Sequence, residues 1–353
     1  MITKRQYDFA GRVILEELGG SGSHHWDFEY NDRSELDRAY RRTGTTTGQG
    51  TLMIPGDHDY AYDPIGNRQQ FTLDSSDAYY CTNKLNQYTY TDDAAGTCPT
   101  PTTPTEDFEY DEDGNLIKDG TCTYTWDAEN RLKSVAPTTP GQGSKKSVFQ
   151  YDYLGRRVHQ QVFVWNTGIS DWNSTPETDL KFAYDQWNVV QAFGVTHNQA
   201  DAVLRSYTWG LDLSGLSGSP GTTGIHGAGG IGGLLAVHEG GDLDSPGPYW
   251  FLYDGNGNVG QVINADDQSI VAHYEYDPYG NTIVIHDTDD SGIAYTNPFR
   301  FSTKWFDDET SLGYWGYRYY SQKLGRWMSR DPIEEKGGYN LYALLNNNAL
   351  ISI

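Results

Sequence analysis

The chain has 353 residues, 40 of them glycine and 27 tyrosine, and a formal net charge of −23 at pH 7. Such an acidic surface argues against binding to nucleic acid or to anionic membranes, both of which attract basic proteins. No run of 18 apolar residues could span a bilayer, and the first 20 residues lack the layout of a signal peptide. Glycine at about 11% and an aromatic fraction of 14% instead favour β structure with many tight turns and a core rich in Tyr and Trp.

A short motif recurs along the chain, built from an aromatic residue, Asp, two further residues, then Gly or Asn. Its eight copies start at these aromatic residues: Tyr7, Tyr62, Tyr110, Trp126, Tyr151, Tyr184, Tyr253 and Tyr276. A degraded copy occupies residues 28–31. Self-similarity of this kind is typical of a repeat architecture rather than of unrelated hairpins.

Each copy reads as a strand, a turn and a returning strand. Seven copies carry a second aromatic residue two positions before the first: Tyr60, Phe108, Tyr124, Phe149, Phe182, Phe251 and Tyr274. A spacing of two places both rings on one face of a strand. The Asp can accept backbone N–H groups in the turn, Gly or Asn supplies the positive φ of a hairpin, and an apolar residue begins the return strand.

The intervals between copies are uneven. Tyr110 and Trp126 are 16 residues apart, whereas Trp126 and Tyr151 are 25 apart. A propeller needs a stricter blade length, so a spiralling antiparallel sheet fits better. Insertions fill the longer intervals, namely Pro/Thr-rich residues 98–106 and 137–146 and the glycine-rich tract 227–236, which lacks the lysine of a phosphate loop and predicts close backbone packing.

Few segments predict anything other than β structure. Residues 33–42 are a weak helix candidate, and residues 338–347 place three leucines at helical spacing. The three cysteines, Cys81, Cys98 and Cys122, suggest neither a zinc site nor a disulfide framework. His24 and His25 lack a third nearby ligand and are expected at the surface.

The C-terminal part carries a second, denser set of motifs. It reads NPFRFS (297–302), WFDDET (305–310), GYRYY (316–320), LGRWMSRDPI (324–333) and NLY (340–342). With the Tyr-Asp repeats before it, the chain resembles the Rhs/YD-repeat family with a C-terminal Rhs repeat-associated core domain. On this resemblance we assign residues 1–289 to the YD-repeat region and residues 290–353 to a truncated core domain.

The resemblance implies an all-β fold. A YD-repeat antiparallel sheet is wound into a spiral or hollow shell, with a mostly β plug and one short helix near the C-terminus. It also implies a role, because many members enclose a C-terminal toxin or effector and release it by autoproteolysis. The expected partner is then the rest of a larger Rhs polypeptide or its effector domain, secreted or at the cell surface.

The resemblance also implies a processing site. In proteolytic members the Arg-Asp-Pro motif belongs to an aspartyl-protease-like centre, and here it is matched by Arg330 and Asp331, which precede Pro332. A carboxylate there would act as a general base on water. The competing interpretation is that both residues only cap a turn. Glu334 and Glu335 occupy positions where the family has other residues, so neither is assigned as the second carboxylate.

The family's cut site follows a segment of the form Asn-Asn-Pro-x4-Asp-Pro-x-Gly-Leu. Residues 347–353 match its first seven positions, with Ala349 in place of Pro. We therefore expect a piece of a longer shell protein, a decayed cassette or a truncated reading frame. Activity on external substrates is not expected.

An acidic loop near residue 290 has two interpretations. Asp287, Asp289 and Ser291 match positions 1, 3 and 5 of a calcium loop, and Gly292 matches position 6. The position of the bidentate Glu is Pro298, so an ordinary acidic surface loop is the alternative. No other cofactor is expected.

Two other functions compete with a shell segment. The aromatic residues could form a surface module that binds carbohydrate or mediates adhesion, for which Trp172 and Trp187 are the exposed candidates. The third hypothesis is a non-functional fragment, whose open sheet edges would leave strand-pairing groups free.

Overall fold

A computed structural model describes residues 3–18, 23–96, 98, 104–195, 201–216, 229–240 and 248–350. These residues form two compact units. Residues 3–121 and 323–350 make unit 1, and residues 122–322 make unit 2. The predicted boundary at residue 290 rests on the family resemblance. The division into compact units does not test a boundary of that kind, so it stays a prediction.

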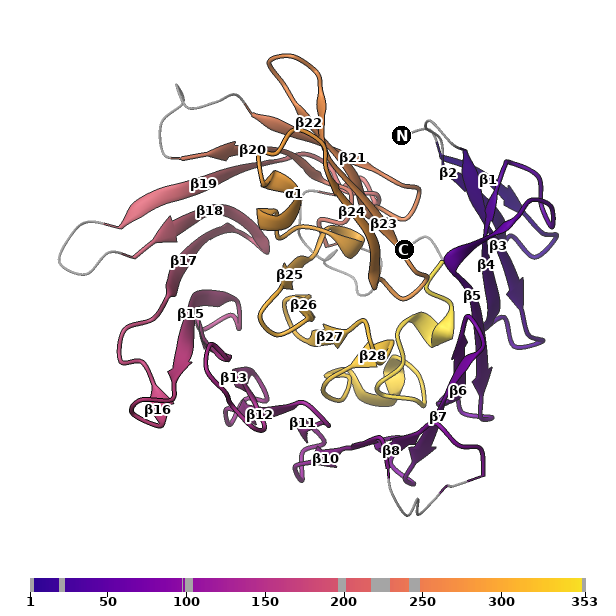
Figure 1. Ribbon diagram of the computed structural model, residues 1–353, viewed down its shortest axis with the longest axis horizontal. Coiled ribbons are helices and arrows are strands. Elements are labelled where there is room, and N and C mark those ends of the chain that lie inside the picture. The colour runs from indigo at the N-terminus through magenta and orange to yellow at the C-terminus, as the bar shows by residue number, and fades with distance from the viewer. Residues whose placement is uncertain are drawn as a thin grey trace. The chain divides into compact units, whose positions relative to one another are not determined.

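Unit 1 is a meander of antiparallel strands. From β1 to β9 each strand pairs with the next one in sequence, as the indigo and purple ribbon of Figure 1 shows. Its strands are β1 (Thr3–Tyr7), β2 (Val13–Leu18), β3 (His24–Tyr30), β4 (Leu36–Thr43), β5 (Leu52–Tyr62), β6 (Arg68–Leu73), β7 (Ser76–Thr82), β8 (Tyr88–Asp92), β9 (Glu106–Asp107), β10 (Glu109–Tyr110), β11 (Leu116–Lys118) and β28 (Arg326–Trp327), and its short 3-10 turns are η2 (Glu334–Lys336) and η3 (Leu345–Asn347).

Unit 2 repeats this pattern and adds a small sheet of its own. Its elements are β12 (Cys122–Trp126), β13 (Leu132–Pro137), β14 (Lys145–Tyr151), β15 (Arg157–Asn166), β16 (Asp171–Trp172), β17 (Thr178–Asp185), β18 (Asn188–Gly194), β19 (Ala202–Trp209), β20 (Leu234–Glu239), β21 (Tyr249–Tyr253), β22 (Val259–Asn264), β23 (Ile270–Tyr276), β24 (Thr282–Asp287), α1 (Ile293–Thr296), η1 (Phe301–Thr303), β25 (Trp305–Asp307), β26 (Leu312–Tyr314) and β27 (Tyr319–Ser321). Among the described strands, β16 pairs with β15 alone and lies outside the strand order of the long sheet. β26 pairs with β25 on one side and with β27 on the other. The predicted all-β, antiparallel fold with one short helix is confirmed. In the described part of the chain, no helix is both long enough and apolar enough to cross a membrane.

The repeated turn has the geometry that the motif predicts. The side chain of its opening Asp or Asn accepts the backbone N–H groups of the second and fourth residues after it, in the turns opened by Asp8, Asn31, Asp63, Asn83, Asp127, Asp152, Asp212, Asp254 and Asp277. One short side chain thus supplies a local acceptor to two turn amides, which is why Asp and Asn favour this position.

The strand register shifts at the aromatic residue that opens the motif, and this explains why that residue is so often tyrosine. At Tyr276 the strand register shifts, which turns the ring toward the previous repeat. Its hydroxyl donates to the carbonyl of Val259, 2.8 Å away, and Tyr151 does the same to Leu132. Burial raises the pKa of both hydroxyls, which keeps them protonated and able to donate.

The second aromatic residue of each motif forms the core. All seven are buried, with Tyr274 1% and Phe149 2% exposed. In a protein this rich in aromatic residues, burial of such rings is the main source of hydrophobic stabilisation of the fold. In β5 the rings of Tyr60 and Tyr62 are stacked with their centroids 6.5 Å apart, so they share one face as the spacing of two predicts.

Loss of one repeat hydroxyl should be measurable. We expect Tyr276→Phe to lower the free energy of unfolding by about 1–3 kcal/mol, because the Val259 carbonyl loses its donor in a buried setting. Tyr153→Phe is the control, because Tyr153 lies at a turn tip and is 90% exposed. Urea unfolding of the two variants should separate them, and equal midpoints would contradict this role of the hydroxyl.

The structure corrects the count of repeats. The degraded copy forms a complete turn at Asn31, and Asn83 and Asp212 open turns that the motif search misses. Conversely, the copy at Tyr184 forms a different, tighter hairpin, in which Asp185 pairs with Asn188 and Gln186 adopts a positive φ.

Both helix predictions are wrong over most of their length. Leu36–Thr43 is strand β4, held between β3 and β5. In the second segment only η3 is helical in part, and Asn346 and Asn347 have positive φ. Strand pairing and side-chain contacts thus override a weak helical pattern.

Two smaller expectations also change. Cys81 and Cys98 form a disulfide, with Cα atoms 5.3 Å apart, because pairing depends on the path of the chain and not on sequence spacing. His25 is buried rather than at the surface and contacts the carbonyl of Gly44 at 2.9 Å. The glycine-rich tract is described only from residue 229, where Gly233 packs against the backbone of Asp212 as predicted.

Candidate functional site

The repeat turns expose one backbone group to the C-terminal residues. We call the fifth residue after the opening Asp the return residue. Three return residues donate their N–H to the C-terminal part of their own unit: Leu116 to the Met328 carbonyl, Val259 to the Arg300 carbonyl and Arg157 to the Tyr314 hydroxyl. The bulge frees this amide from the strand ladder, and the C-terminal residues satisfy it.

In unit 1 the C-terminal residues follow a row of repeat turns. Asn347 donates to Glu35 and to the Gly66 carbonyl, at 3.0 and 2.7 Å. Further contacts of this kind join Asn348 to Ser34, Asn340 to Asn67, Arg326 to Asn86, and Tyr342 to Gln87 and Gly114. In Figure 1 this yellow segment lies along the purple strands. Each of these turns is thus bonded by at least one polar side chain of the segment, and these bonds fix the register of the segment along the turns.

In unit 2 residues 299–322 contact the turns in the same way. The Ser302 amide donates to the Asn258 side chain, and the Thr303 hydroxyl donates to the Gly257 carbonyl. The Tyr320 hydroxyl donates to the Tyr279 carbonyl. The segment is therefore bonded to the turn residues themselves and not only packed against them.

A buried ion pair joins the two parts of unit 2. Arg157 and Asp307 are each 1% exposed at the side chain, and their nearest nitrogen and oxygen are 2.5 Å apart. The guanidinium lies over the rings of four aromatic residues: Phe149, Phe182, Trp305 and Tyr314. Burial alone would lower the pKa of Arg157, but the Asp307 carboxylate and the nearby Tyr319 and Tyr184 hydroxyls together outweigh that effect, and the pKa rises.

Arg330 and Asp331 lie in unit 1, within the C-terminal segment that contacts the repeat turns. The Arg330 guanidinium approaches Gly114 so closely that a Cβ there would be 2.4 Å from Nε. The Asp331 carboxylate accepts the N–H of Ile333 at 3.0 Å, a turn-capping contact. This geometry suits the capping interpretation, and the processing role stays a proposal. Glu334 and Glu335, which were not assigned, are exposed.

The predicted calcium loop is organised around the start of α1. Asp287 accepts the N–H of Gly292 at 2.8 Å, and Asp289 accepts that of Ser291 at 3.0 Å. Among the described residues, no group of three or more His, Cys, Asp or Glu side chains could hold a metal ion. The calcium site stays a prediction, for which a heat of binding in calorimetry is the required result.

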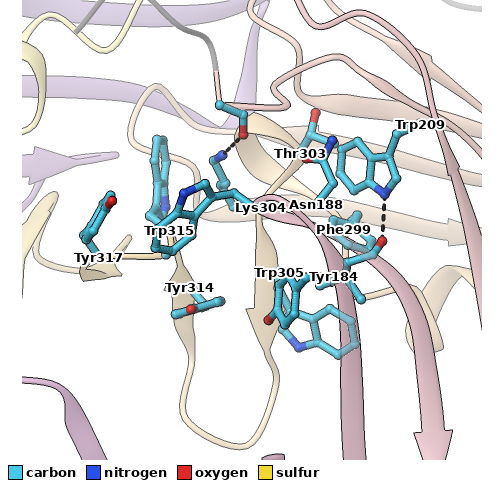
Figure 2. Close-up of a pocket in the computed structure, with 14 residues that line it drawn as sticks. Tyr184, Asn188, Trp209, Phe299, Thr303, Lys304, Trp305, Tyr314, Trp315 and Tyr317 are labelled. Atoms are coloured by element: carbon cyan, nitrogen blue, oxygen red, sulfur yellow. Dashed lines mark hydrogen bonds between the residues drawn. The ribbon is translucent and has the colours of Figure 1, made fainter. Parts of the chain in front are cut away.

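Sequence reasoning missed an aromatic pocket in unit 2 of about 140 Å³. Its walls include Phe299, Trp305 and Trp315, and Lys304 lies between them, as Figure 2 shows. The lining residues come from positions 184–189, 209, 229 and 299–317, so no local motif marks the pocket. Of the two predicted exposed tryptophans, Trp187 lies at this pocket, and both are half-buried.

Comparison with known proteins finds relatives by sequence but no matching family model. The tRNA3(Ser)-specific nuclease WapA of Bacillus spizizenii is 27% identical over 303 residues, and the tRNA nuclease WapA of Bacillus subtilis is 29% identical over 303 residues. Each match covers 84% of this chain but only 10% of the relative, so the chain spans about a tenth of these proteins.

A third relative comes from another organism. Toxin subunit YenC1 of Yersinia entomophaga is 25% identical over 318 residues, which are 83% of this chain and 28% of that subunit. The crystal structure of TcdB2-TccC3 without its hypervariable C-terminal region covers all of this chain and 19% of its own, at 18% identity and a TM-score of 0.47. The sequence relatives are thus two tRNA nucleases and a toxin subunit, each much longer than this chain.

Proposed function

We propose that this chain is an encapsulating segment of an Rhs-type toxin protein. Such a protein encloses a C-terminal effector and releases it by cutting its own backbone. The partner would be the remainder of a larger polypeptide, secreted or displayed at the cell surface, with its effector domain.

The contact between the repeat turns and the C-terminal residues carries the proposal. A repeat sheet that encloses its C-terminal segment needs hydrogen bonds to that segment at regular intervals. Side chains such as Asn347 and Tyr342 supply these hydrogen bonds. The similarity to nucleases and a toxin subunit supports the toxin context.

Asp331 is the residue we propose for processing. Hydrolysis of one peptide bond consumes one water. The Asp331 carboxylate would take a proton from it, the water oxygen would bond to the carbonyl carbon, and the C–N bond would break as the nitrogen takes up that proton. Arg330 would orient this carboxylate.

The test is to extend the chain after Ile353 with Asp-Pro-x-Gly-Leu and a passenger domain. We expect mass spectrometry of the purified product to find two fragments, and the Asp331→Asn variant to remain whole. Asparagine keeps the oxygen that accepts the Ile333 amide, so the fold should survive.

Glu334→Gln is the matched control, because Glu334 is exposed and has no proposed role. It should be cut like the parent. An extended chain that stays intact, or an Asp331→Asn variant that is cut equally well, would remove the processing role.

A further inference from the structure

The pocket around Lys304 has the composition of a ligand site. Its deep wall is made of buried aromatic side chains: Phe299 is 4%, Tyr314 7% and Trp305 9% exposed. Its rim is more open, because Tyr317 is 63% exposed and packs on Trp187 with ring centroids 4.5 Å apart. Small-molecule sites are typically concave and aromatic, with few well-placed polar groups.

Among the described residues that line the pocket, Lys304 carries the one charged group. Its ammonium donates to the Gly229 carbonyl at 2.6 Å and lies 5.5 Å from the centre of the Trp315 ring. Figure 2 shows Lys304 beside Trp315. The described residues give it no ion pair. The Asp212 carboxylate raises the pKa of Lys304 through its charge. Its oxygens accept hydrogen bonds from Ser214, Leu216 and Gly230 in its own turn.

Lys304 is half-buried, and an ammonium held between aromatic rings without a paired anion loses part of its hydration. A bound anion would offset that loss. The surrounding rings favour a flat or ring-shaped molecule. The volume of about 140 Å³ suits one six-membered ring with an acidic substituent.

We propose that this pocket binds a single ring that carries a carboxylate, with the ring against the aromatic walls and the carboxylate on the Lys304 ammonium. An acidic sugar and an aromatic acid share this chemistry. The proposal does not depend on the shell function, since it needs only the pocket of unit 2.

The test is calorimetry on the full chain with two acids and their uncharged counterparts. The probes are glucuronate with methyl glucoside, and 4-hydroxyphenylacetate with 4-methylphenol. We expect at least one acid to bind and its counterpart to bind about tenfold more weakly or worse, because a hydrogen bond to a charged group is lost. Binding by glucuronate alone identifies an acidic sugar, and binding by the other acid alone identifies an aromatic acid.

Variants locate the binding. Lys304→Met keeps the apolar stem and should weaken the acid about tenfold or more. Trp187→Ala, at the half-buried rim, should also weaken it and leaves Lys304 in place. The controls are Lys146→Met and Trp172→Ala, a lysine and a tryptophan ring 5.9 Å apart outside the pocket, and both should bind normally.

The dependence on pH gives a second readout. Burial lowers the pKa of Lys304 to about 8, against the opposing effect of Asp212. Tyr184, Tyr314 and Tyr317 also face the pocket, and burial raises the pKa of Tyr184 and Tyr314, so those two stay neutral. Affinity should therefore fall as the pH rises above about 8, where the amine loses its charge. Absence of binding by both acids, equal binding of the uncharged counterparts, or full affinity in Lys304→Met would overturn the proposal.

Discussion

Replacing Asp307 with alanine is expected to lower the free energy of unfolding by about 3–5 kcal/mol. The Arg157 guanidinium would remain 1% exposed among aromatic rings with its carboxylate removed. A buried charge that loses its partner is among the most destabilising changes known for a single side chain, because its desolvation is no longer offset. Urea unfolding followed by tryptophan fluorescence would measure the loss.

Two comparisons isolate the buried pair. The exposed pair between Lys181 and Asp201 has side chains 47% and 30% exposed, so Asp201→Ala should cost no more than about 1 kcal/mol. The double variant Arg157→Met with Asp307→Leu should recover much of the lost stability, because two apolar side chains need no partner. If Asp307→Ala cost no more than Asp201→Ala, the pair would not hold the two parts of unit 2.

The second large effect is expected at Gly114, and Gly155 provides its control. Both occupy the same position of a repeat turn, with φ of +83° and +82°. Alanine in that left-handed conformation costs roughly 1–2 kcal/mol at either site. At Gly155 the new Cβ meets nothing within 4 Å, whereas at Gly114 it would be 2.4 Å from Arg330 and 2.6 Å from the Tyr342 hydroxyl.

The difference between these variants reports the contact with the C-terminal segment. We expect Gly114→Ala to lose about 1–3 kcal/mol more than Gly155→Ala, which is typical of overpacking. Limited proteolysis should also cut residues 323–350 faster in Gly114→Ala alone. Equal stability losses and equal cutting rates would mean that the segment is not bound at this turn.

Much of the fold could be predicted from one local rule. The motif specifies a side-chain acceptor for the turn amides, a residue with positive φ and two rings on one strand face. Together these features predict a hairpin without reference to the rest of the sequence. A search for Asp misses turns that open with Asn. The side chains of Asn31 and Asn83 accept the turn N–H groups just as an Asp side chain does. The rule also failed at Asp185, where the same letters form a shorter turn.

The candidate site was less predictable, because its contacts join residues far apart in sequence. The resemblance marked Arg330 and Asp331, but nothing local indicated that Asn340 and Asn347 bind the turns of Asp63 and its neighbours. The Lys304 pocket likewise combines segments more than 100 residues apart. Such sites depend on tertiary packing, which periodicity in one sequence does not encode.

Amide hydrogen exchange of the unmodified chain would test most directly whether the C-terminal residues are bound to the repeats. The return-residue amides of Leu116, Arg157 and Val259 donate to Met328, Tyr314 and Arg300. These three amides should exchange as slowly as the central strand amides of their own unit. Exchange at the rate of an unfolded chain would show that the C-terminal residues leave the repeat turns unbound.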